Sequence, residues 1–63
     1  MSEDSLDIAA RRMLARFGGL AAEITAGRAE EMARHGDWRG QDMALLMLNR
    51  IETLAAPQRP AAR

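Results

Sequence analysis

Apolar residues in the first half of the chain recur with the spacing of one face of an α-helix. From Leu6 to Ile24 the intervals alternate between four and three residues, which keeps the side chains on one side of a helix. This apolar stripe comprises Leu6, Ala10, Met13, Phe17, Leu20 and Ile24, and Met32 continues it. The pattern predicts one long helix over about residues 5–35, with Asp4 or Ser5 as its N-terminal cap.

Gly18 and Gly19 lie in the middle of this helix and suggest an alternative. Each glycine costs about 1 kcal/mol in a helix interior, and glycine often follows the last residue of a helix. The apolar stripe nevertheless runs across both glycines without a change of phase. A continuous helix, bent at the glycines, is therefore favoured over two shorter helices that meet near Phe17.

The segment His35-Gly36-Asp37 marks the next boundary. Gly36 suits the left-handed position that closes a helix, and Asp37 suits the cap of the following helix. A second helix is expected over about residues 38–55. The link is short, so the two helices should lie antiparallel.

The chain has 63 residues, enough for one small domain. Pro57 cannot continue the second helix. We expect a helical domain at 5–56, a flexible N-terminus at 1–4 and a Pro/Ala-rich tail at 57–63. A core of this size rarely supplies more than about 3–5 kcal/mol. There is no cysteine to form a disulfide, so a partner or a second copy is expected to contribute stability.

The second helix has more apolar surface than one neighbouring helix can cover. Its main stripe consists of Gly40, Met43, Ala44, Met47, Leu48, Ile51, Leu54 and Ala55. Trp38 and Leu45 are seven residues apart and lie close to the opposite side of the helix, while Leu46 lies on another flank. Tryptophan is enriched where proteins bind one another. These three residues are therefore a candidate contact patch.

The predicted helix lengths also suggest a second chain. At 1.5 Å per residue, a helix over 5–35 spans about 45 Å and one over 38–55 about 27 Å. The longer helix would overhang the shorter one and leave Leu6, Ala10, Met13 and Phe17 uncovered. The predicted fold is all-α, a two-helix antiparallel hairpin that dimerises into a four-helix bundle. The alternative is a three-helix bundle broken at Gly18-Gly19.

Composition and charge narrow the possible functions. Apolar residues make up 48% of the chain, and valine and tyrosine are absent, which favours helix over strand. The formal net charge is zero, and this argues against a dedicated nucleic-acid binder. No apolar run is long enough to span a membrane. The acidic N-terminus is unlike a signal peptide, so a cytoplasmic location is expected.

Candidate chemical groups are few. Glu31, His35 and Asp37 could hold a divalent ion, but a histidine near a helix C-terminus followed by a capping aspartate explains them better. Asp37 and Asp42 are paired carboxylates without a nucleophile nearby. No phosphate-binding glycine motif occurs. We therefore expect no enzyme activity, no cofactor and no metal.

Three further features have simple structural interpretations. Gly27 and Gly40 lie on facing stripes and could allow close helix approach, or they could be tolerated costs near a turn. Arg11, Arg12 and Arg16 form a basic edge that is expected to be a solvated helix face. The internal methionines are expected to fill the core, although methionine-rich surfaces also adapt to partner helices; they are Met13, Met32, Met43 and Met47.

The segment from Arg28 to Gly40, followed by Met47, Ile51 and Leu54, resembles a group of short uncharacterised bacterial helical-hairpin proteins. That group carries an RA-x-apolar-G-D-x-x-G stretch and then an amphipathic helix. It usually has an aromatic residue after the second glycine, where this chain has Ala44. The resemblance implies a helical hairpin and no particular activity.

Taken together, the sequence predicts a non-catalytic interaction protein, either a small homodimeric adaptor or regulator or an accessory subunit of a larger complex. An antitoxin-like or nucleic-acid-associated regulator is the alternative. The residues predicted to contact the partner are Leu6, Ala10, Met13, Phe17, Leu20, Ile24, Trp38, Leu45 and Leu46. The predicted capping and turn residues are Ser5, Gly36 and Asp37.

Overall fold

The computed structural model describes residues 3–55, and every element in that range is helical. The elements are α1 (Glu3–Phe17), the short 3-10 helix η1 (Gly18–Leu20), α2 (Ala21–Arg34) and α3 (Trp38–Ala55). The all-α prediction is therefore confirmed. The predicted tail at 57–63, together with residues 1, 2 and 56, lies outside the described residues. Within 3–55, no helix combines the length and apolarity needed to cross a bilayer.

The first helix begins earlier than the sequence suggests. Glu3 and Asp4 belong to α1 rather than to a flexible N-terminus, and Ser5 lies inside the first turn instead of at the cap. The prediction failed because Asp4 and Ser5 are good capping residues but are also tolerated in the first turn of a helix. A negative side chain such as that of Asp4 interacts favourably there with the positive end of the helix dipole.

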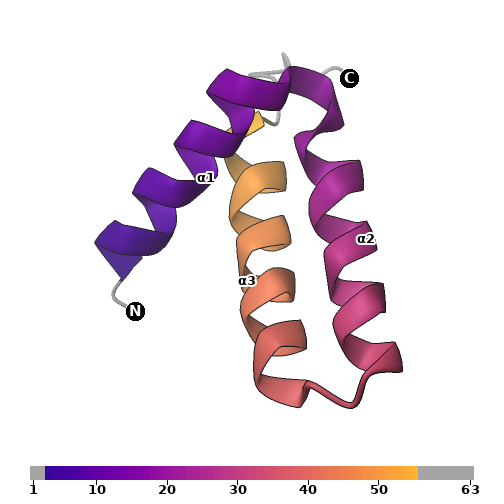
Figure 1. The fold of residues 1–63 in the computed structure, drawn as a ribbon. Helices are drawn as coiled ribbons and strands as arrows, with labels where there is room; N and C mark the ends of the chain where they lie inside the picture. Colours follow the sequence, from indigo (N-terminus) through magenta and orange to yellow (C-terminus); the bar gives the residue numbers. More distant parts are fainter. Residues whose placement is uncertain (1–2, 56–63) are drawn as a thin grey trace, which may run out of the picture.

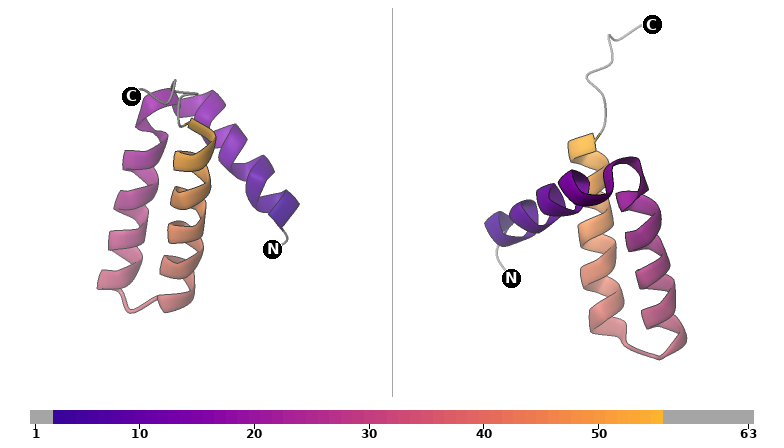
Figure 2. Two further views of the ribbon diagram at one scale, coloured as in Figure 1. Left: turned by 180° about the vertical axis from the view of Figure 1, so that it is seen from behind. Right: turned by 45° about the horizontal axis from the view of Figure 1, so that its top comes forward.

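The prediction of one continuous helix over 5–35 is wrong, and the three-helix alternative fits the structure. Gly18 has φ +57°, a left-handed conformation that other residues rarely adopt. The chain changes direction there, and α1 turns back across α3 while α2 runs beside α3 (Figures 1 and 2). Because α1 and α2 both pack against α3, their apolar faces stay in phase across the bend.

A small core lies where the three helices meet. Ala10 of α1, Ala21 of α2 and Ile51 of α3 are fully or almost fully buried. Ile51 is the only large side chain among the described residues with less than 2% of its surface exposed. The partly buried residues packed around this cluster are Met13, Leu14, Phe17, Ala22, Met47 and Leu54.

The contact between α2 and α3 is made largely by small side chains. Ala29 and Ala44 are buried there, as is Thr25, which is 3% exposed. The Thr25 hydroxyl has no hydrogen-bond partner among the described residues. Small residues let the two helices approach closely, but they bury little apolar area. The one large side chain that is fully buried among the described residues, Ile51, lies in the cluster with Ala10 and Ala21.

The turn between α2 and α3 forms as predicted. Gly36 has φ +74°; its N–H donates to the Ala33 carbonyl at 3.1 Å, and the Asp37 N–H donates to the Met32 carbonyl at 2.8 Å. These two bonds define a Schellman ending. Asp37 Oδ1 then accepts the N–H of Gly40 at 2.9 Å, which caps α3.

Gly27→Ala is expected to stabilise the fold. Gly27 is exposed in the middle of α2, and a Cβ built there meets no atom within 4 Å, so of the two interpretations of this glycine the structure favours a tolerated cost over close helix approach. Alanine should add about 0.5–1 kcal/mol through helix propensity, measured as a higher Tm by circular dichroism.

Gly40→Ala is the matched control for this prediction. A Cβ at Gly40 would crowd the Asp37 carboxylate and come within 2.8 Å of Met32 Sδ. Much of the propensity gain should therefore be lost through the disturbed cap. A Tm for Gly27→Ala at or below that of the wild type would contradict the prediction.

Candidate interaction surface

The predicted overhang of the first helix does not exist, because the bend at Gly18 folds α1 onto α3. Ala10 is 0% exposed, and Met13 and Phe17 pack against the core within the same chain. Ala10 is therefore buried, and Met13 and Phe17 are partly covered, within one molecule. The prediction that the first helix leaves these three side chains uncovered is wrong.

The other predicted contact residues of the first stripe are distributed differently. Leu6 and Ile24 are half-buried, whereas Leu20 lies in η1 and is 58% exposed. Of these three, Leu20 alone is largely exposed in the single chain. Leu20 remains accessible at the corner where α1 and α2 meet.

The predicted patch on α3 remains exposed within the single chain. Trp38 is 66% exposed, Leu45 46% and Leu46 53%. Trp38 and Leu45 are two helical turns apart on one side of α3. Exposed large apolar side chains that gather on one face are typical of contact surfaces.

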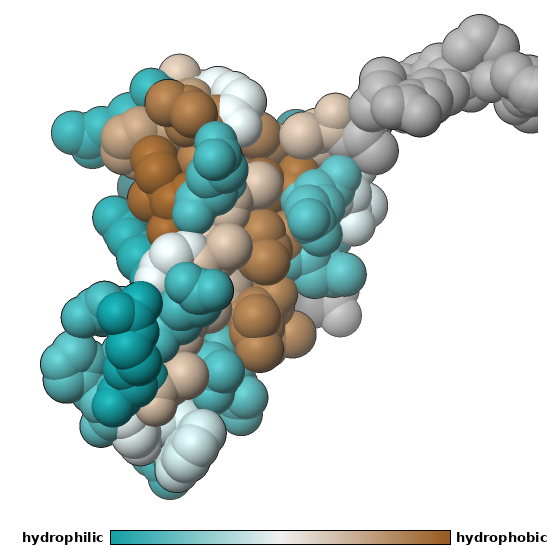
Figure 3. Space-filling model, turned by 90° about the vertical axis from the view of Figure 1, so that its right-hand side faces the viewer, coloured by the Kyte–Doolittle hydropathy of each residue, from teal (hydrophilic) through white to brown (hydrophobic). Residues whose placement is uncertain are grey.

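Leu45 also lines a shallow groove that runs between α2 and α3, and we call it the hairpin groove. Its walls are Ala26, Ala29, Glu30, Ala33 and Arg34 of α2 and Gln41, Leu45 and Leu48 of α3. Its volume is about 530 Å³. Figure 3, which views the molecule from the side of α2, shows brown hydrophobic side chains exposed between the teal hydrophilic ones.

A second groove lies on another side of α3, between α1 and the hairpin, and we call it the α1 groove. Its apolar lining includes Ile8, Met13, Phe17 and Met47, and its volume is about 660 Å³. Arg12, Arg16 and Arg28 also line it. Sequence reasoning missed this groove because it exists only when α1 bends back; the 52% exposed Ile8 lies outside the predicted stripe.

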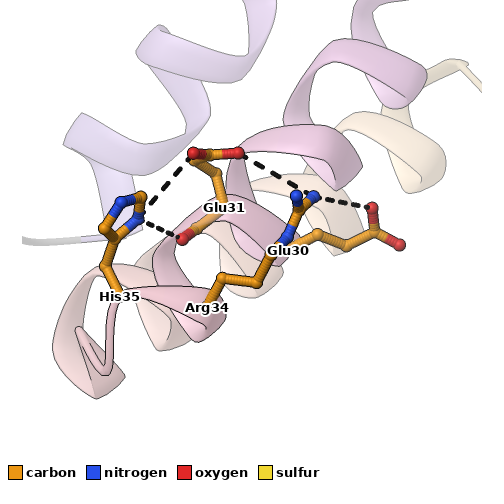
Figure 4. Close-up of polar contacts among 4 residues, drawn as sticks. All are labelled: Glu30, Glu31, Arg34 and His35. Atoms are coloured by element: carbon orange, nitrogen blue, oxygen red, sulfur yellow. Dashed lines mark hydrogen bonds and ion pairs between the residues drawn. The ribbon is translucent and has the colours of Figure 1, made fainter.

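Two of the three residues that were weighed as candidate metal ligands, Glu31 and His35, are engaged in local contacts at the end of α2 (Figure 4). His35 Nδ1 lies 2.8 Å from the Glu31 carbonyl oxygen, so Nδ1 carries the proton and donates. The Glu31 carboxylate is 3.8 Å from both Arg34 and His35, and Arg34 is also 3.9 Å from Glu30. The exposed ion pairs of Arg34 contribute little individually, but the positive charge of Arg34 in the last turn of α2 complements the helix dipole.

The third candidate ligand, Asp37, caps the N-terminus of α3. Its Oδ1 accepts the Gly40 N–H. Within residues 3–55 the structure forms no group of three or more His, Cys, Asp or Glu side chains able to hold a metal ion. Capping and dipole contacts account for the arrangement of Glu31, His35 and Asp37.

No protein-family model, no curated protein and no solved structure shows significant similarity to the chain. Inferences about function therefore rest on the two grooves and the exposed residues of α3.

Proposed function

We propose that this chain is a non-catalytic interaction module that forms a homodimer through the outer side of the α2–α3 hairpin. The observation that carries the proposal is the exposure of Trp38 and Leu45 on one face of α3, at 66% and 46%, together with the position of Leu45 in the wall of the hairpin groove. In water, an indole and a leucine on one helix face favour burial against another surface.

The hairpin groove is suited to a second helix pair. Ala26 and Ala33 are small, half-buried side chains two turns apart on α2 that line this groove, which permits close approach of another helix. In a two-fold arrangement, Leu45 of one copy would pack against Ala26 and Ala33 of the second copy, and Leu45 of the second copy would make the same contact in return. Two hairpins packed in this way make a four-helix bundle.

The charges at the groove are compatible with the same arrangement. Glu30 and Arg34 line one wall and have opposite signs. Across a two-fold axis, the carboxylate of one copy can meet the guanidinium of the other, so self-association brings no net repulsion. The small core around Ile51 gives a further reason, because a dimer would bury apolar area that a single chain leaves exposed.

The test compares two aliphatic-to-glutamate substitutions at sites of similar exposure. Wild-type protein and Ile8→Glu should sediment as dimers at high micromolar concentration, whereas Leu45→Glu should sediment as a monomer with unchanged helical circular dichroism. Ile8 is 52% exposed but lies on α1, away from the hairpin groove. The chain has one tryptophan, so its emission should shift to shorter wavelength on dimerisation.

Two results would overturn the proposal. One is a wild-type protein that stays monomeric across the concentration range. The other is a dimer that Leu45→Glu leaves intact, since the interface would then lie elsewhere on the molecule.

A further inference from the structure

The α1 groove adjoins a smaller, open cavity. The small cavity has a volume of about 220 Å³ and shares Met13, Arg28 and Met47 with the larger groove. The two together form one trough between α1 and the hairpin. Figures 1 and 2 show α1 diverging from α2 and α3 as it runs away from the bend.

All internal methionines of the sequence line the small cavity. They come from three different helices: Met13 from α1, Met32 from α2, and Met43 and Met47 from α3. Thioether side chains are flexible and polarisable, and surfaces rich in them adapt to the apolar faces of helices. Core filling explains part of this arrangement, but Met43 remains 36% exposed.

The charged residues that line the trough are arginines. They are Arg12, Arg16 and Arg28, and none of the described carboxylates is among the lining residues. None of these three arginines has a carboxylate partner among the described residues, whereas the other arginines there, except Arg39, are paired with acids. The guanidinium of Arg16 lies 5.7 Å from the centre of the Phe17 ring.

We propose that the α1 groove binds an acidic amphipathic helix of a partner protein. The methionines and Ile8 would receive the apolar face of that helix, and the unpaired arginines would meet its carboxylates. The wall from Ile8 to Phe17 is about 14 Å long at 1.5 Å per residue, enough to contact two to three turns of a helix.

The form of the groove favours a helix over a small molecule. Small-molecule sites bury most of the surface of their ligand, whereas this trough is open to solvent along one side. Its apolar floor favours a peptide over a nucleic acid, because the phosphates of a nucleic acid would contact the arginines but not the apolar side chains. The inference extends the proposed function, since it treats the chain as a binding module, but it uses residues outside the hairpin groove.

The probe is a fluorescein-labelled synthetic peptide designed to be helical, with leucines at i, i+3, i+4 and i+7 and glutamates beside them. Fluorescence anisotropy should give micromolar binding to the full chain. A peptide with lysine in place of glutamate should bind at least about tenfold more weakly because it meets three arginines. A glutamate peptide with its leucines scrambled should not bind.

Variants of the chain locate the contact. Arg12→Gln, Arg16→Gln and Arg28→Gln should each weaken binding roughly two- to fivefold, as expected for exposed charge pairs. Arg39→Gln is the matched control. Arg39 is also without a carboxylate partner among residues 3–55 but lines neither cavity, so this variant should bind the glutamate peptide with the affinity of the wild type.

Ile8→Glu should abolish peptide binding and leave the dimer intact, whereas Leu45→Glu should do the reverse. This pair distinguishes failure of the groove proposal from failure of the dimer proposal. Equal binding of the lysine peptide, or binding unaffected by the three arginine variants combined, would overturn the groove proposal. So would arginine-dependent binding of laurate or of a short DNA duplex in place of the peptide.

Discussion

Ile51→Ala is expected to remove most of the stability of this fold. Ile51 is 1% exposed and packs between Ala10 and Ala21 at the meeting point of the three helices. Truncation to alanine removes buried methyl and methylene groups and leaves a cavity, at a cost of about 2–4 kcal/mol. The core of a domain of this size rarely supplies more than about 3–5 kcal/mol of the free energy of unfolding. Urea denaturation followed by circular dichroism measures the difference.

The control for Ile51→Ala is Ile8→Ala, the same chemical change at a residue that is 52% exposed. It should alter the free energy of unfolding by less than about 0.5 kcal/mol. If both variants unfolded at the wild-type denaturant midpoint, Ile51 would not be the centre of the core.

The dependence on one isoleucine follows from the alanine-rich sequence. Ala10, Ala21, Ala29 and Ala44 are buried, but each contributes only a methyl group to the core. Small side chains bring the helices close together without adding much apolar area. This explains why the amphipathic pattern predicted helices well, while it did not show how little apolar area the packed helices would bury.

Elements with local signals were predicted closely. The turn at Gly36 and Asp37 and the helix over 38–55 appear in the structure as expected, because glycine conformation and side-chain capping depend on neighbouring residues alone. The exposure of Trp38 and Leu45 also followed from their position opposite the main stripe of α3.

Elements that depend on tertiary packing were not predicted. The apolar phase across Gly18 fits a straight helix and a bent pair equally well when both halves pack on the same neighbour. The bent pair is more stable only if the free energy gained by packing α1 on α3 exceeds the free-energy cost of ending the helix at Gly18. The α1 groove was missed for the same reason, since Ile8 and Arg28 come together only after the bend.

Gly18→Ala is expected to destabilise the bent arrangement by about 1–2 kcal/mol. The φ of +57° at Gly18 lies in the left-handed region, where the Cβ of an alanine would come too close to its own backbone. The substitution also raises helix propensity at the junction. Both effects favour a straight helix through α1 and α2, in which α1 leaves α3 and exposes Ala10 and its neighbours. Urea denaturation measures the loss, and small-angle X-ray scattering should detect the longer particle.

Gly19→Ala provides the control for this bend. Gly19 does not have a positive φ, and a Cβ there meets no atom within 4 Å, so its stability should remain close to the wild type. Straightening at Gly18 would also dismantle the α1 groove, whose walls come from α1 and the hairpin. The Gly18→Ala variant should therefore lose the acidic peptide while keeping the dimer contact at Leu45. Equal stability of Gly18→Ala and Gly19→Ala would contradict a left-handed Gly18 as the source of the bend.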